Sequence, residues 1–219
     1  MPTPVVIDYY SDVLCVWAWI AQRRIEELNE KLLGKIEVRY HYLDVFGDAS
    51  NKIPQQWADR GGYAGFAKHV VDSAAPYPDA VINPNIWHKI RPNTSANAHL
   101  ILKAVELSCG KEKSNELALL IRQAFYIEGQ DIGQLRLLFS LLKSVDIDKE
   151  LIKNSLCDGS AMALLMADYQ QAKVLSLKGS PSYIIDNGRQ VLYGNIGYRV
   201  LLANIEEHLK QPRQEASWC

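Results

Sequence analysis

The stretch SDVLCVWAWI, Ser11 to Ile20, places a cysteine where a strand runs into a helix. It follows PVVIDYY, Pro4 to Tyr10, an apolar and β-branched run with the short length of a buried strand. From Cys15 the apolar residues recur near helical spacing, and Gly34 ends the pattern as a helix C-cap does. KIEVRYHYLDVF then alternates apolar and polar residues from Ile36 onward, which predicts a second strand. Residues 1–45 therefore predict a β-α-β unit.

The middle of the chain predicts helices, and its end predicts strands again. Residues 46–91 are rich in Gly, Asn and Pro, which favours loops with short helical pieces. Helical patterns follow at residues 94–109, 111–127, 132–145, 149–157 and 160–177. Two short apolar runs then flank Asn187 and Gly188, a strong hairpin signal, and YRVLLANIEEHL predicts a closing amphipathic helix.

This order of elements predicts one α/β sheet interrupted by helices rather than two serial domains. We expect residues 1–45 to form a βαβ half, residues 46–165 a loop-rich and helical insertion, and residues 166–219 a helix followed by a ββα half. These are the two halves of a thioredoxin fold. The expected fold class is therefore α/β, thioredoxin-like, with an inserted all-helical domain.

Composition excludes several classes of function. The 219 residues carry 24 basic and 25 acidic side chains, which leaves no basic stripe for a nucleic acid. No apolar run is long enough to span a membrane. The N-terminus lacks the features of a secretory signal, so we expect a cytoplasmic protein. The four cysteines match neither a zinc site nor a disulfide scaffold, and we expect mostly free thiols.

Four segments resemble the DsbA-like thioredoxin family, especially its FrnE-like cytoplasmic branch. They are DYYSDVLCVWAWIA (8–21), RPNTSANAHLILKA (91–104), AFYIEGQDIGQ (124–134) and DYQQAKVLSLKGSPSYIIDNGRQVLYGN (168–195). The resemblance covers nearly the whole chain. It implies a thiol-disulfide oxidoreductase.

The position of Cys15 has a physical logic. In a thioredoxin fold the reactive cysteine lies at the first turn after the first strand. The first N–H groups of a helix are unpaired and the helix dipole is positive there, so an anion is stabilised. We expect this to lower the pKa of the Cys15 thiol by roughly one unit, which favours the attacking thiolate.

The redox turn departs from the family pattern. The family usually has Cys-Pro-Trp-Cys, whereas this chain has Cys15, Val16, Trp17 and Ala18. Ala18 cannot close an internal disulfide. We therefore expect Cys15 to form mixed disulfides with a protein or glutathione, which an outside thiol then releases. Trp17 either stacks on that substrate or packs in the core.

A second signal is KGSPSYIID, residues 178–186, where Pro181 opens an apolar strand. The resemblance implies that Pro181 is cis and lies beside Cys15, and that the backbone of Ser180 pairs with an extended substrate. Ser180 is expected either to donate a hydrogen bond to the thiolate, which would lower its pKa, or to be an ordinary turn serine.

Two alternative functions stay open. Kappa-class glutathione transferases and 2-hydroxychromene-2-carboxylate isomerases resemble this chain in topology, and they use a single serine near the Cys15 position to hold the glutathione sulfur. That resemblance implies a glutathione-binding role for Asn195, whereas a loop cap is the simpler interpretation. The third hypothesis is a non-catalytic binding protein. Glutathione is the one co-substrate expected, with no permanently bound cofactor.

The remaining candidates have structural interpretations. His99 is interpreted as a core or surface histidine, with proton transfer as the alternative. Cys109 and Cys157 lie at helix ends, and Cys219 is a conceivable resolving thiol if the C-terminal tail folds back. The Asp146, Asp148 and Glu150 cluster is expected to cap a helix rather than bind a metal. A thiol, disulfide or small-molecule substrate is the expected partner, and the oligomeric state stays open, with a dimer among the alternatives.

Overall fold

The computed structural model describes residues 4–210, and its centre is a four-stranded sheet in the order β2-β1-β3-β4. β1 (Val5–Ser11) pairs in parallel with β2 (Ile36–Tyr42) and antiparallel with β3 (Ser182–Ile185). β4 (Gln190–Tyr193) pairs antiparallel with β3 through a hairpin turn at residues 186–189. This β-α-β and β-β-α arrangement confirms the thioredoxin-like fold that the sequence predicts.

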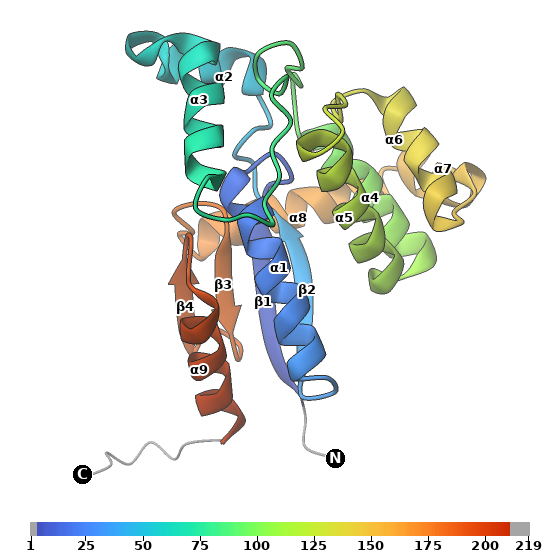
Figure 1. Cartoon of the computed structure of the whole chain (residues 1–219). Helices are drawn as coiled ribbons and strands as arrows, with labels where there is room; N and C mark the ends of the chain where they lie inside the picture. The colour runs from blue at the N-terminus through green and yellow to red at the C-terminus, as the bar shows by residue number, and fades with distance from the viewer. Residues whose placement is uncertain (1–3, 211–219) are drawn as a thin grey trace.

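Two helices cover one face of the sheet (Figure 1). They are α1 (Val16–Lys31), which connects β1 to β2, and α9 (Tyr198–Leu209), which ends the described chain. Ile25 and Leu28 of α1 and Leu201 of α9 are buried in one apolar cluster with Ile7 of β1. Burial of such side chains contributes about 1.5–3 kcal/mol each, which fixes α1 and therefore its N-terminus on the sheet.

Seven further α-helices lie between β2 and β3. They are α2 (Ala49–Gln56), α3 (Gly62–Ala74), α4 (Ala96–Cys109), α5 (Lys111–Tyr126), α6 (Leu135–Leu142), α7 (Lys149–Cys157) and α8 (Ser160–Val174). Their apolar side chains form one cluster with Val16, Trp19 and Ile20 of α1. The inserted helices therefore pack directly on the end of α1 that carries Cys15. None of the described helices is both long and apolar enough to cross a membrane.

One expectation needs correction. Residues 46–91 contain more than short helical pieces, because α3 runs for 13 residues. Its residues Phe66, Ala67 and Val70 are buried, so tertiary packing stabilises a helix in a glycine-containing segment. The expected boundary at 165/166 falls inside α8, which is one continuous helix from Ser160 to Val174.

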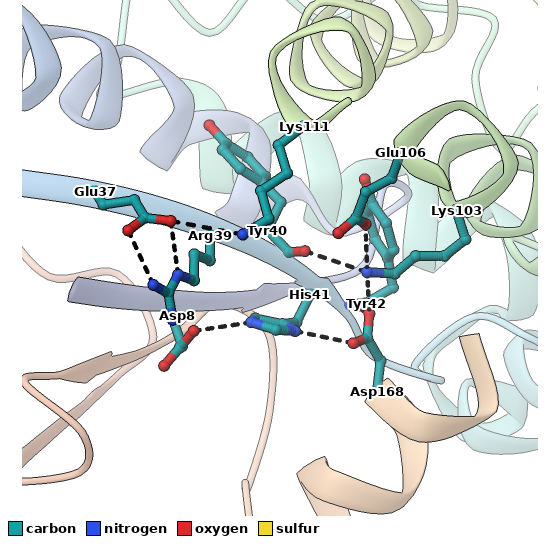
Figure 2. Close-up of polar contacts among 10 residues, drawn as sticks. All are labelled: Asp8, Glu37, Arg39, Tyr40, His41, Tyr42, Lys103, Glu106, Lys111 and Asp168. Atoms are coloured by element: carbon teal, nitrogen blue, oxygen red, sulfur yellow. Dashed lines mark hydrogen bonds and ion pairs between the residues drawn. The ribbon is translucent and has the colours of Figure 1, made fainter. Parts of the chain in front are cut away.

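A polar cluster joins the sheet to the inserted helices (Figure 2). His41 of β2 places one ring nitrogen 2.9 Å from Asp8 of β1 and the other 2.9 Å from Asp168 of α8. Lys103 of α4, which is 1% exposed, lies 2.9 Å from Asp168 and 2.8 Å from Glu106. His41 on the polar face of β2 therefore contacts α8, while Glu37 and Arg39 on the same face pair with each other and stay partly exposed.

The charge of His41 follows from this geometry. Burial alone lowers the pKa of His41, but its hydrogen bonds to Asp168 and Asp8 outweigh burial and raise the pKa above its ordinary value. A protonated imidazole donates to both carboxylates, whereas a neutral one directs a lone pair at one of them. The stabilisation is therefore fully present below the unfolded-state pKa, and it is lost as the pH rises through the higher folded-state pKa.

We expect His41→Gln to lower the free energy of unfolding by about 1–3 kcal/mol at pH 5.5, because charge-assisted hydrogen bonds are lost. The difference from wild type should shrink as the pH rises to 9. Urea unfolding across this pH range measures it, with the exposed His88→Gln as the control. A difference that stays constant with pH contradicts a protonated His41.

Candidate functional site

Two segments that are far apart in the sequence meet at Cys15. Cys15 is the N-cap of α1, with extended backbone angles (φ −82°, ψ 117°), and only 6% of it is exposed. Its thiol donates a hydrogen bond to the backbone carbonyl of Ser180, with 3.2 Å between Sγ and O. The Ser180–Pro181 peptide bond is cis. The turn after β1 and the loop before β3 thus form one site around the sulfur.

The pKa of Cys15 corrects the expectation from the sequence. Burial raises the pKa of this thiol, and burial outweighs the hydrogen bonds from Ser180 and from the backbone amides of Ala18 and Trp17, which lower it. The backbone amides at the start of α1 therefore lower the pKa of Cys15, as expected, but burial raises it by more. At rest Cys15 is a protonated thiol whose S–H is bound to the Ser180 carbonyl.

Ser180 contributes both its backbone and its side chain. Its hydroxyl oxygen accepts a hydrogen bond of 3.0 Å from the backbone N–H of Asp12. The hydroxyl proton is not used in that contact, and a side-chain hydrogen bond from Ser180 lowers the pKa of Cys15. Ser180 thus ties the loop before β3 to the turn that holds the thiol.

Asp12 organises this turn, and the sequence analysis did not single it out. Its carboxylate is fully buried and accepts from the backbone N–H of Leu14 at 2.9 Å and of Phe46 at 2.8 Å. It also accepts from Ser95 Oγ at 2.8 Å and from Val45 N at 3.2 Å. Burial raises the pKa of Asp12 to about 6, against the opposing effect of these donors. The signal in the sequence was an aspartate at a strand end, where Asx turns form.

His99 supports the same turn from α4. Its Nε2 lies 3.2 Å from Val13 N and, facing an N–H donor, acts as the acceptor. Its Nδ1 lies 3.1 Å from the hydroxyl of Tyr169. Burial lowers the pKa of His99 to about 3, so the ring is neutral. His99 is therefore a satisfied core histidine that positions the turn two residues before Cys15.

Trp17 and Ala18 occupy different environments. The Trp17 ring is partly buried, and its centroid lies 6.5 Å from that of His69 on α3. His69 in turn lies 5.1 Å from Trp57, so an aromatic cluster adjoins the start of α1. Ala18 is completely buried, and its backbone N–H donates to the Cys15 carbonyl at 3.0 Å. Trp17 combines core packing with a partly accessible ring beside the site.

Asn195 is not joined to this site by any hydrogen bond. Its side chain is exposed, accepts from Arg24 at 2.5 Å and donates to Tyr77 at 2.7 Å. It thus links three segments of the fold, which is more than the loop cap that the sequence suggested. The glutathione contact that the resemblance implies for Asn195 stays a prediction.

The other expected candidates lie outside the site. Cys109 is partly buried and Cys157 is exposed, and both are free thiols at helix ends. Asp148 accepts from Glu150 N at 3.0 Å and caps α7, as expected. Cys219 lies outside the described residues. Across residues 4–210, no group of three His, Cys, Asp or Glu residues is arranged to hold a metal ion.

The Cys15 turn contains one reactive group, the Cys15 thiol. Cys15 is a free cysteine, and the position one helical turn further along holds Ala18. A thiolate at Cys15 can attack a disulfide and become covalently attached to one of its sulfurs. No second thiol in the same turn can displace that attachment.

Solved structures with the same fold include proteins of thiol chemistry and an isomerase. A Nitrosomonas europaea protein, for which protein disulfide isomerase activity is proposed, has a TM-score of 0.78 at 18% identity, over 95% of this chain and 99% of that one. The cytosolic disulfide reductase DsbM from Pseudomonas aeruginosa has a TM-score of 0.72 at 19% identity, over 94% and 100%. A 2-hydroxychromene-2-carboxylate isomerase has a TM-score of 0.63 at 14% identity, over 94% and 97%. These identities establish a shared fold and no more.

The sequence itself carries a family signature over most of its length. A search of curated proteins finds no match. The model of the DSBA-like thioredoxin domain, however, matches residues 6–206, from β1 into α9. The match includes the Cys15 turn, the inserted helices and the Ser180–Pro181 loop. The chain therefore belongs to the DSBA-like thioredoxin domain family.

Proposed function

We propose that this protein catalyses thiol-disulfide exchange through Cys15 alone. The observation that carries the proposal is the 3.2 Å contact of the Cys15 sulfur with Ser180, at the loop that contains the cis peptide bond before Pro181. This places one thiol at the start of a helix and beside the edge of a loop along which a substrate can lie. Family membership supports this class of chemistry.

The proposed reaction has two exchange steps. Cys15 loses its proton to solvent, and its thiolate attacks one sulfur of a substrate disulfide. A disulfide forms between Cys15 and that sulfur, while the other sulfur leaves as a thiolate and takes up a proton. A second thiol, for which glutathione is the candidate, then attacks the substrate sulfur of the mixed disulfide. Cys15 leaves as a thiolate, so the protein returns to its starting state with no net change of redox state.

The raised pKa of Cys15 favours a reducing role over an oxidising one. A cysteine whose thiolate is stabilised is a good leaving group and readily donates its disulfide. Burial opposes that stabilisation at Cys15. A smaller fraction of the Cys15 thiol is therefore ionised at neutral pH, but each thiolate is the poorer leaving group, which favours removal of glutathione or another thiol from more acidic cysteines. The structural similarity to DsbM, a cytosolic disulfide reductase, is consistent with this direction and with action in the cytosol.

Turnover of a glutathionylated peptide tests the proposal. With glutathione as the reductant and the formation of oxidised glutathione coupled to glutathione reductase, wild type should give parallel double-reciprocal lines, the pattern of a covalent intermediate. Cys15→Ser should fall to the rate without protein, because serine forms no mixed disulfide. Cys109→Ser and Cys157→Ser are the controls and should keep the wild-type rate.

Three outcomes contradict the proposal. Turnover that survives Cys15→Ser shows that another group does the chemistry. Saturable glutathione binding by Cys15→Ser, combined with conjugation or isomerisation activity, supports the glutathione-dependent transferase or isomerase instead. An inactive wild type that still binds a folded partner supports the non-catalytic alternative.

A further inference from the structure

A groove beside the loop that carries Ser180 has no assigned role. It encloses about 340 Å³ between the segment after β2, α2, the end of α8 and the segment that leads to Ser180. Its apolar part is formed by Leu43, Val45, Tyr169, Ala172 and Leu177. A volume of this size suits a few side chains of an extended peptide.

One wall of the groove adjoins the residue that contacts the Cys15 sulfur. Gly179 lines the groove, and the next residue is Ser180, whose carbonyl accepts the hydrogen bond from the thiol at 3.2 Å. An extended chain advances about 3.3 Å per residue. A substrate whose reacting disulfide lies at Cys15 and whose chain runs along residues 177–179 therefore places side chains in the groove within two or three positions of its reacting cysteine.

The rim of the groove is positively charged. Lys52 of α2, Lys173 of α8 and Lys178 all line it. Within residues 4–210, other lysines such as Lys68 and Lys153 form ion pairs with carboxylates. The three lysines of the groove form no ion pair with a carboxylate in that part of the chain. Lys52 donates instead to the backbone carbonyl of Val45.

One acidic side chain, Asp44, opposes these three lysines within the groove. One of its carboxylate oxygens lies where a Cβ atom would extend from Gly47, so the side chain is folded back over its own loop. The adjoining hollow along α2 adds Asp48, which still leaves lysines in excess. The groove thus combines an apolar floor with unpaired ammonium groups.

We propose that this groove binds an acidic segment that flanks the reacting disulfide of a peptide or protein substrate. The inference rests on the proposed exchange at Cys15 and adds its substrate class. Lys173 and Lys178 are the specificity-determining residues, because within the described part of the chain both line the groove without a carboxylate partner and neither donates to a backbone carbonyl as Lys52 does. Carboxylates of the segment pair with their ammonium groups, while neighbouring side chains cover the apolar floor.

Two ten-residue peptides test the proposal. Each carries one cysteine as a mixed disulfide with glutathione, flanked on both sides by glutamates in one peptide and by lysines in the other. Because the glutathionyl group is common to both, the ratio of their kcat/KM values isolates the flanking charge. Wild type should favour the acidic peptide by about tenfold at low salt, with a smaller preference at 500 mM NaCl.

The double variant Lys173→Glu, Lys178→Glu should abolish or reverse this preference. Its matched control is Lys89→Glu, Lys149→Glu, which makes the same change in net charge at two exposed lysines outside the groove and should keep the preference. The control double variant should exchange with a peptide of neutral flanks at the wild-type rate, because it changes neither the groove nor the Cys15 turn. Single Lys→Gln variants at positions 173 and 178 should each weaken the preference in part.

The outcomes separate this inference from the proposed function. If wild type has equal kcat/KM values for the two peptides and exchange still depends on Cys15, the proposed binding of an acidic segment in the groove is wrong. The proposed exchange reaction is unaffected by that result. An equal loss of preference in both double variants also overturns the proposed binding in the groove, because the effect is then one of net charge. Absence of exchange with every peptide overturns both proposals.

Discussion

Replacing Ala18 with cysteine is expected to shorten the lifetime of the mixed disulfide on Cys15 by about 100-fold, because an intramolecular thiol acts at a high effective concentration. Positions 15 and 18 lie one helical turn apart, and the Ala18 N–H binds the Cys15 carbonyl at 3.0 Å. Side chains at this spacing are neighbours on the helix surface, within the separation that a disulfide bridges. The variant should therefore release its substrate by closing an internal disulfide.

Rapid acid quenching followed by intact mass measures this lifetime. Ala18→Ser is the control, since it adds a polar atom at the same position without a thiol. Because Ala18 is fully buried, either substitution should cost about 1–3 kcal/mol of stability, and urea unfolding checks that both variants remain folded. A folded Ala18→Cys protein with an unchanged adduct lifetime contradicts the placement of these two side chains.

Asp12→Ala should lower the free energy of unfolding by about 3–5 kcal/mol, the largest stability effect that we expect from one substitution at the site. The change leaves four donors without an acceptor. Three are backbone N–H groups, of Leu14, Val45 and Phe46, and the fourth is the Ser95 hydroxyl. Each buried donor without a partner costs about 1–3 kcal/mol, reduced where the loops relax or water enters.

Urea unfolding of three variants tests this expectation. Asp12→Asn should have an intermediate effect, because its amide keeps one oxygen acceptor but directs N–H groups at other donors. Asp44→Ala, an exposed aspartate near the same loop, should change stability by less than about 0.5 kcal/mol. An Asp12→Ala protein as stable as wild type contradicts the role of this carboxylate in holding the Cys15 turn.

Much of the fold follows from local patterns. The helical spacing and the Gly34 signal predicted α1, and the alternation after Ile36 predicted β2. The residues Asn187 and Gly188 predicted the hairpin, and both adopt positive φ angles there. These patterns succeed because each element carries its own apolar face and its own termination signal. α3 was missed because its stability comes from burying Phe66 and Val70 against residues far away in the chain.

The site was predictable in its position and not in its electrostatics. Cys15 and Ser180 are 165 residues apart, and their contact follows from the fold class. The shift of the Cys15 pKa depends on how deeply the thiol is buried, and a sequence does not display burial by distant segments. Asp12 shows the same limit. Its carboxylate accepts hydrogen bonds from Val45 N and Ser95 Oγ, and these donors reach it only after the chain has folded.

The measurement that tests the central claim most directly is intact mass after incubation with oxidised glutathione, for wild type and Cys15→Ala. We predict one glutathionyl adduct that depends on Cys15, forms faster as the pH rises past the ordinary thiol pKa, and is released by added thiol. Equal adduct formation in both proteins, or an adduct on wild type that added thiol does not release, contradicts a single-cysteine exchange site at Cys15.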